Sequence, residues 1–337
     1  MPEDRTPTPP PRYRWRLLRA GSFRLDGGSM FGLIPRTVWT RAVTPDDRGR
    51  IPVHHNCLLL ERDGDGPGPK LVVIETGTGN KLDPKNRDLF ALEDRSILDA
   101  LHDADCRPED VGAVVVTHLH FDHAGGLTRL ARPGETPDWT GPASTFGSSR
   151  GDHAVKRTFP NAAVYVQQRE WEDAIANRSV MTRTYFPDHL EPIREQIRTV
   201  NSPRPFPPGY TPGRDETPPT PVSLRETPLW PGGGISVFLV PGHTWGQQAI
   251  KFTDTAGRTV VFTPDVMPTV NHLGAAYNLA YDVEPYTSMV TRRWFLEAAA
   301  AESWTLVLDH EPGNPVQTVR ATDRGWFELA AAAEPTL

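Results

Sequence analysis

The stretch AVVVTHLHFDHAGGL at residues 113–127 constrains the fold of this 337-residue chain more than any other. Its apolar, β-branched first half predicts a buried strand. Four potential metal ligands then fall within six residues: His118, His120, Asp122 and His123. His118 and His120 stand at positions i and i+2 of an extended chain, so both can reach one ion. Asp122 and His123 come where the chain begins to turn, and the spacing therefore favours two neighbouring ions over one.

Three further candidate ligands each follow a predicted strand. His243 comes after the apolar run ISVFLVPG, Asp265 after TVVFTP, and His310 after WTLVLD. Side chains placed just beyond strand ends build the sites of α/β folds. A single histidine in a loop is more often a surface residue. The same placement three times, together with the cluster at 118–123, favours one metal centre.

Short β-branched runs alternate with helical patterns, which predicts an α/β sandwich with helices over the sheet faces. The predicted strands are residues 57–61, 71–75, 113–117, 163–167, 235–240, 248–253, 259–263 and 304–308. The predicted helices are residues 95–103, 168–177, 189–199 and 287–302. We expect one domain over residues 16–325, with a disordered tail at 1–15 and a C-terminal tail at 326–337. The polar segment 132–158 and the proline-rich segment 202–231 are predicted to be loop insertions, which either overhang the site or are solvated without a function.

Composition narrows the class of protein. No stretch reaches the roughly 20 apolar residues of a membrane span, and the amino terminus has no apolar signal core, so we expect a soluble, cytoplasmic protein without a membrane partner. A net charge of -6 with scattered arginines argues against a nucleic-acid partner. Cys57 and Cys106 fit neither a disulfide framework nor a CxxC pattern. The expected partner is a small-molecule substrate, and the oligomeric state stays open, a dimer being one alternative.

The segment HLHFDHAGG matches the HxHxDH signature of the metallo-β-lactamase superfamily, and PGHTWGQ, the aspartate after a strand and the late histidine resemble its downstream motifs in the same order. The resemblance covers about residues 20–320. It implies a four-layer αββα sandwich with two divalent ions at one edge of the sheets, Zn²⁺ first and Mn²⁺ or Fe as alternatives. It further implies that the first ion is held by His118, His120 and His243, the second by Asp122, His123 and His310, and that Asp265 bridges them.

Within the superfamily, the stretches LDGGSMFGLIPRTVW, TGTGNK and DVMPTVNHL are most similar to the lactonase and organophosphate-hydrolase-like branch. Three positions differ from the usual pattern. Glu75 stands where an aspartate usually precedes Thr-Gly, Pro264 where a glycine commonly precedes the bridging aspartate, and Pro268 where the quorum-sensing lactonases carry a tyrosine. The last difference argues against acyl-homoserine-lactone hydrolysis, although not against hydrolysis. Glu75 is a candidate acceptor for a ligand histidine.

The resemblance implies a hydrolase in which two ions share a hydroxide that attacks a lactone, an ester or a phosphotriester. Beside its ligand role, Asp122 is a candidate catalytic residue that accepts the hydroxide's hydrogen bond and later helps to protonate the leaving group. His272 is a candidate proton donor, with a structural histidine as the alternative. Trp245, Met267, Tyr277 and Tyr281 are candidate substrate contacts near the ligands.

Four other functions are alternatives to this one. A thioester hydrolase of the glyoxalase II type needs basic residues near the site, and the sequence has no clear basic cluster there. A nuclease is disfavoured by the net acidity. A flavin-partnered diiron oxidoreductase has glutamate in place of His120 and a fused flavin domain, neither of which this sequence contains. A non-catalytic metal-binding scaffold is disfavoured because all seven candidate ligands are present.

Overall fold

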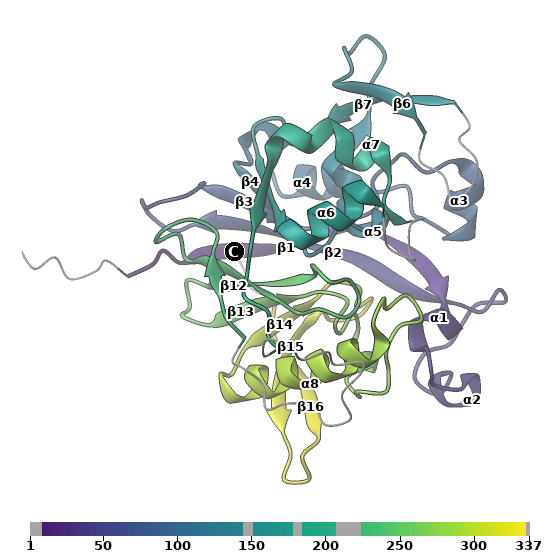
Figure 1. The fold of residues 1–337 in the computed structure, drawn as a ribbon, viewed down its shortest axis with the longest axis vertical. Helices are drawn as coiled ribbons and strands as arrows, with labels where there is room; N and C mark the ends of the chain where they lie inside the picture. The colour runs from purple at the N-terminus through teal and green to yellow at the C-terminus, as the bar shows by residue number, and fades with distance from the viewer. Residues whose placement is uncertain (1–8, 144–150, 178–183, 207–223, 335–337) are drawn as a thin grey trace, which may run out of the picture.

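The computed structural model describes residues 9–143, 151–177, 184–206 and 224–334. Two large sheets lie face to face in the middle of the molecule, with α4 and α6 above one sheet and α8 below the other in Figure 1. These helices span Ile97–Asp103 (α4), Gln168–Ala176 (α6) and Pro285–Ala301 (α8). The predicted four-layer αββα sandwich is confirmed.

The first sheet has six strands in the order β1-β2-β3-β4-β8-β9. They span Tyr13–Asp26 (β1), Arg50–Arg62 (β2), Leu71–Ile74 (β3), Ala113–Val115 (β4), Ala163–Gln167 (β8) and Ile197–Val200 (β9). The pairs from β1 to β3 are antiparallel, whereas β3, β4, β8 and β9 run parallel to one another. The loops that leave β3 and β4 therefore start at the same edge of the sheet.

The second sheet has seven strands in sequence order. They span Thr227–Pro228 (β10), Ile235–Leu239 (β11), Gln248–Thr253 (β12), Thr259–Thr263 (β13), Thr305–Leu308 (β14), Val316–Ala321 (β15) and Phe327–Ala331 (β16). Only β13 and β14 pair in parallel among these neighbours, with α8 as the crossover between them. A separate small sheet contains Thr128–Leu130 (β5), Asp152–Arg157 (β7) and Trp139–Pro142 (β6).

Residues 57–60 in β2 show why the molecule has four layers. Cys57 and Leu59 pack into the apolar cluster that α4 and α6 cover, whereas Leu58 and Leu60 pack into the core between the two sheets. Successive side chains of a strand point to opposite faces. A strand without polar residues is therefore expected where both faces of its sheet are covered. A third cluster lies between the second sheet and α8.

An N-terminal extension flanks the edge at which the sheet loops gather. Beyond the sheet, β1 continues into α1 (Gly27–Phe31) and α2 (Arg36–Trp39). Phe23, Met30, Phe31 and Trp39 form an apolar cluster with Leu279 from the loop before α8. The remaining short helices are α3 (Pro84–Leu89), α5 (Phe121–Ala124) and α7 (Pro187–Leu190). No helix within the described ranges combines the length and the apolar character needed to cross a membrane.

The predicted limits of the domain are wrong at both ends. Strand β1 begins at Tyr13, inside the predicted tail at 1–15, because Tyr13 and Trp15 pack edge-on against Phe252 of the second sheet. Strand β16 pairs with β15 inside the predicted tail at 326–337.

Two internal predictions also need correction. Part of the predicted loop 132–158 forms β6 and β7, while its residues 144–150 and residues 207–223 of the proline-rich segment lie outside the described residues. The predicted helix 189–199 is instead the end of α7, a 3₁₀ segment and then β9. Pro192 lacks an N–H for a continuous helix, and the segment IRTV that follows is β-branched.

Candidate metal centre

The seven predicted ligands come together at one edge of the two sheets, and all are buried. The loop after β4 and helix α5 carry the cluster at residues 118–123. His243 lies in the β11–β12 loop, Asp265 follows β13, and His310 follows β14. The strand ends thus meet as the sequence predicts, and the seven side chains divide into two groups.

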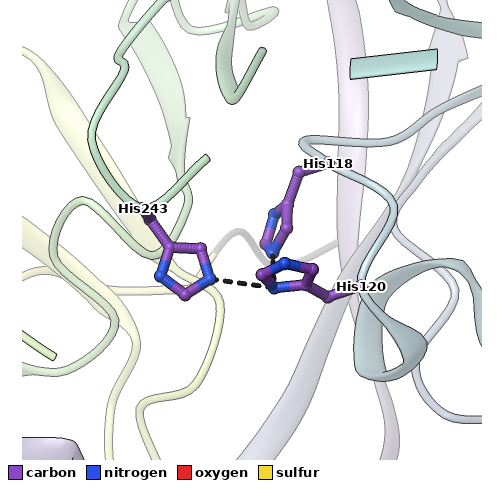
Figure 2. Close-up of side chains that lie close together, drawn as sticks. All are labelled: His118, His120 and His243. Carbon is purple, nitrogen blue, oxygen red and sulfur yellow. Dashed lines mark hydrogen bonds between the residues drawn. The ribbon is translucent and has the colours of Figure 1, made fainter. Parts of the chain in front are cut away.

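The first group consists of His118, His120 and His243, whose ring nitrogens are turned toward one another in Figure 2. His118 Nε2 lies 3.1 Å from His120 Nδ1, and His243 Nε2 lies 3.0 Å from the same nitrogen. A tetrahedral ion with nitrogen ligands at ~2.0–2.1 Å separates neighbouring nitrogens by about 3.3 Å. The spacing of the three imidazoles therefore fits one shared ion.

The second group consists of Asp122, His123 and His310. The Nε2 atoms of His123 and His310 are 3.2 Å apart. The Asp122 carboxylate lies beside both rings, with Oδ1 3.9 Å from His123 Nε2 and Oδ2 3.7 Å from His310 Nε2. This donor set of two imidazoles and a carboxylate also fits a divalent ion.

Asp265 lies between the two groups. Its Oδ2 is 3.0 Å from His243 Nε2 in the first group, and its Oδ1 is 3.4 Å from His310 Nε2 in the second. One carboxylate thus presents a different oxygen to each group. That arrangement is the one a bridging ligand requires.

The outward nitrogens of three ligand histidines, His123, His243 and His310, lie beside groups that can only accept a hydrogen bond. Acceptors of this kind place the proton on the outward nitrogen, so the inward nitrogen carries a lone pair toward the centre. The three such pairs are His243 Nδ1 with Asp282 Oδ1 at 3.0 Å, His123 Nδ1 with Glu75 Oε2 at 3.2 Å, and His310 Nδ1 with the His54 carbonyl at 2.8 Å. The residues present therefore fit divalent metal ions.

Glu75 is the acceptor that the sequence predicts, and the structure confirms its contact with a ligand histidine. Its backbone has φ +66°, a left-handed conformation that is uncommon for a residue with a side chain. The other carboxylate oxygen accepts a hydrogen bond from the Thr117 backbone N–H at the end of β4. This strained residue thus joins the loop after β3 to the HxHxDH segment.

The pKa values of the ligand histidines are shifted in different directions. Burial lowers the pKa values of His118 and His120 well below the ordinary value, and neighbouring histidines lower them further. Burial acts in the same direction on His123, but the carboxylates of Glu75 and Asp122 raise its pKa well above the ordinary value. His118 and His120 are therefore neutral in the metal-free protein. Burial lowers the pKa of His243 as well, but the Asp265 and Asp282 carboxylates raise it above the ordinary value.

A buried glutamate that the sequence analysis missed joins the two loops of the first group. Glu170 of α6 is 0% exposed. Its carboxylate accepts hydrogen bonds from Leu119 N at 3.0 Å, Tyr185 Oη at 3.1 Å and Thr244 Oγ1 at 2.6 Å. Leu119 lies between the first two histidines and Thr244 follows the third. The available signal was a glutamate among the apolar positions of the predicted helix 168–177.

Asp282 is a second missed residue, since a lone aspartate in a loop has no sequence signature. Its Oδ2 accepts a hydrogen bond from Leu279 N at 3.1 Å. Behind it, the fully buried Arg292 of α8 donates to the carbonyls of Val266, Gly274 and Tyr277. The arginine therefore fixes the loop that follows Asp265.

A mainly apolar cavity of about 230 Å³ opens beside the centre. Five of the candidate ligands line it: His120, Asp122, His243, Asp265 and His310. The other lining residues are Leu25, Met30, Phe90, Phe121, Thr184, Leu279 and Tyr281. Of the predicted substrate contacts, Tyr281 thus lines the cavity. Met267 packs instead in the core under α8, and Tyr277 packs against Phe31.

The contacts of His272 favour the structural alternative over the predicted catalytic role. The ring is 0% exposed and stacks on Phe31 with a centroid distance of 5.0 Å. Its Nδ1 lies 2.8 Å from Thr269 Oγ1, and its Nε2 lies 2.8 Å from the Met30 carbonyl. Both nitrogens are occupied by the protein, so His272 holds α1 against the β13–α8 loop and has no nitrogen for a substrate.

Comparisons with known proteins agree with this geometry. A model of the metallo-beta-lactamase superfamily matches residues 50–310. A solved structure of a probable metal-dependent hydrolase from Staphylococcus aureus is similar with a TM-score of 0.71 and 22% identity, over 98% of this chain and 100% of that one. AidC, a dizinc quorum-quenching lactonase, is similar with a TM-score of 0.66 and 15% identity, over 98% and 97%.

The hydrolase AbOPH of the beta-lactamase superfamily is similar with a TM-score of 0.65 and 17% identity, over 98% of this chain and 100% of that one. No curated protein matches the chain. The structural similarities show a shared fold, and the family model covers most of the chain, including every predicted ligand. The chain therefore belongs to the metallo-beta-lactamase superfamily.

Proposed function

We propose that this chain is a dinuclear metal-dependent hydrolase that acts on a small, mainly apolar lactone, ester or phosphotriester. The position of Asp265 carries the proposal, because its two oxygens lie 3.0 Å and 3.4 Å from nitrogens of different ligand groups. When bound, two neighbouring divalent ions would supply a nucleophilic hydroxide at neutral pH and polarise the substrate. Membership of the superfamily supports the enzyme class.

Asp122 is the residue best placed to move a proton. Its carboxylate lies beside His310 of the second group, and the residue also lines the cavity. It can accept a proton from the attacking nucleophile on one side and deliver it to the leaving oxygen on the other. Among the described residues that line this cavity, the other acid is Asp265, which occupies the proposed bridging position.

The cavity favours a neutral substrate. Leu25, Met30, Phe90, Phe121 and Leu279 supply apolar walls, and the described lining contains neither lysine nor arginine. A glutathione-like thioester or a nucleic acid would bring negative charge to these walls without a cation to pair with it. Polar side chains among these walls include Thr184 and Tyr281. The ring of a lactone or an aryl ester suits this combination.

The test is a panel of chromogenic lactones, aryl esters, phosphotriesters and thioesters, assayed with and without a chelator. We expect neutral lactones or esters to be hydrolysed, with activity lost on chelation and restored by Zn²⁺ or Mn²⁺. Metal analysis of the purified protein should find about two ions per chain. Hydrolysis that survives complete removal of metal would contradict the proposal, as would a well-folded sample that retains one ion at saturation.

A further inference from the structure

Asp309 is a buried carboxylate whose role the seven predicted ligands do not explain. It directly precedes His310 and is 2% exposed. Neither carboxylate oxygen has a hydrogen-bond partner among the described residues. A buried carboxylate without a partner is costly. A group other than the protein's own hydrogen-bond donors is therefore expected to satisfy it.

The carboxylate faces the second ligand group. One ligand atom from each of His123, Asp265, Asp309 and His310 lies within 4.8 Å of all the others. In an octahedral site with ligands at ~2.1 Å, opposite donor atoms are about 4.2 Å apart. The four donors can thus surround one ion after small side-chain rotations.

The backbone around Asp309 is fixed on both sides. Its N–H donates to the Thr263 carbonyl of β13 at 3.2 Å, and its carbonyl accepts from the Asn56 N–H of β2 at 2.9 Å. The Asn56 side chain donates to the carbonyls of Leu308 and Glu311, at 2.9 Å and 2.8 Å. Both sheets therefore hold this carboxylate in its inward position, and it is not a surface acid that happens to point inward.

We propose that Asp309 supplies an additional carboxylate ligand to the second ion of the metal centre. The inference rests on the proposed dinuclear site. It gives the second ion an oxygen-rich shell of Asp122, Asp265 and Asp309 with two histidines, beside a first ion held mainly by imidazole. Carboxylate-rich shells suit Mn²⁺ or Fe²⁺, whereas imidazole-rich shells suit Zn²⁺. The two positions of this centre therefore prefer different metals.

The first experiment measures metal binding without substrate. Metal-free wild-type protein and the Asp309→Asn variant are titrated separately with Mn²⁺ and Zn²⁺ by calorimetry, and bound metal is counted by mass spectrometry. We expect Asp309→Asn to weaken Mn²⁺ at the second position by about tenfold or more, while one Zn²⁺ still binds the first position with unchanged affinity. Two Mn²⁺ ions bound with wild-type affinity would overturn the proposal.

A matched control separates this effect from the loss of any buried aspartate. Asp254 is 2% exposed and pairs with Arg258 in the β12–β13 hairpin, at the opposite end of those strands. Asp254→Asn should leave both affinities unchanged. If the wild type itself binds fewer than two ions, the dinuclear site fails. If the wild type binds two and Asp309→Asn does the same, only the role of Asp309 fails.

A second variant detects coordination directly. Asp309→Cys replaces the carboxylate with a thiolate, which binds Co²⁺ with a charge-transfer absorption in the near ultraviolet. We expect this band in the Co²⁺-loaded variant and not in the Co²⁺-loaded wild type, whose Cys57 and Cys106 lie outside the candidate ligand groups. A folded, Co²⁺-loaded variant without the band would overturn the proposal even if Asp309→Asn failed to fold.

Discussion

The two ligand groups are built in different ways, although they lie side by side. The first group uses three histidines, and side-chain carboxylates hold it in place: Asp282 holds His243, and Glu170 joins the two loops. The second group contains the carboxylate of Asp122, and its two histidines have different acceptors: the Glu75 carboxylate for His123 and the His54 backbone carbonyl for His310.

This difference indicates how each position is adjusted. A side-chain acceptor can be replaced with little disturbance of the chain, so the first position can be weakened alone. In the second group only His123 has such an acceptor, Glu75, because His310 is held by a backbone carbonyl that a substitution cannot remove. Variants that affect one group and spare the other therefore test the comparison directly.

The largest effect is expected from Asp265→Ala, which removes the residue that the two groups share. Loss of an essential group of this kind typically lowers kcat by about 1,000-fold or more. Both positions should also lose metal affinity. Steady-state kinetics and metal counting provide the measurement, with Asp254→Asn as the control. Undiminished turnover would exclude Asp265 from the bridge.

The next effect is expected from Asp282→Asn, which removes the charged acceptor behind His243 and retains the shape of the side chain. Changes to such supporting residues cost about 10–100-fold in metal affinity. The loss should be confined to the first position. Calorimetric titration with Zn²⁺ measures it, and an equal loss at both positions would show that the two groups do not behave independently.

A smaller effect is expected at the cavity wall. Phe90 lines the cavity and contacts Phe121, at a centroid distance of 5.3 Å, but belongs to neither ligand group. Phe90→Ala should lower kcat/KM for apolar substrates by about tenfold, the scale of a lost apolar contact. Metal content should stay at the wild-type value. A change in metal content would show that Phe90 also supports the metal centre.

The smallest effect at neutral pH is expected from Lys81, which is buried and donates to the carbonyls of Gly125 and Thr128 behind the second group. Burial lowers its pKa from 10.5 to about 8, although the Asp188 charge opposes this shift. A lysine whose folded-state pKa is depressed stabilises the protein above its unfolded pKa, and this stability is lost as the pH falls toward the folded value.

The titration of Lys81 should therefore make the free energy of unfolding rise between about pH 8 and pH 10.5. Lys81→Met removes the titrating amine and should flatten that part of the profile. Denaturant titrations of metal-free protein at several alkaline pH values measure both curves. Identical slopes in the wild type and the variant would show that the Lys81 amine does not change its protonation on folding.

The sequence predicts the central strands and the ligands for the same physical reason. Buried strands such as 71–75 and 113–117 need apolar residues on both faces, which gives continuous β-branched runs, and the ligands follow directly at the strand ends. Strand β1 is not predicted in this way, because its segment RWRLLRAGSFRL mixes arginines with apolar residues on a partly covered strand. Strand β16 is not predicted either, because its residues are mostly exposed.

The supporting residues could not be predicted from one sequence. Glu170 and Asp282 are single carboxylates, and each acquires its role from partners far away in the chain. His272 shows the opposite case, since its position seven residues after Asp265 suggests chemistry, whereas its contacts favour a structural role. Proximity along the chain near a strand end identifies ligands well, whereas it says little about the residues that orient them.

The contacts of Glu170 also have a consequence for the order of folding. Leu119 lies in the part of the chain that forms the first sheet, and Thr244 lies in the part that forms the second. Glu170 comes from a third segment. Closing such long loops is entropically costly, so these hydrogen bonds form only after the two halves have docked. A metal ion bound there would therefore slow unfolding without accelerating folding, because its ligands are not yet assembled in the transition state.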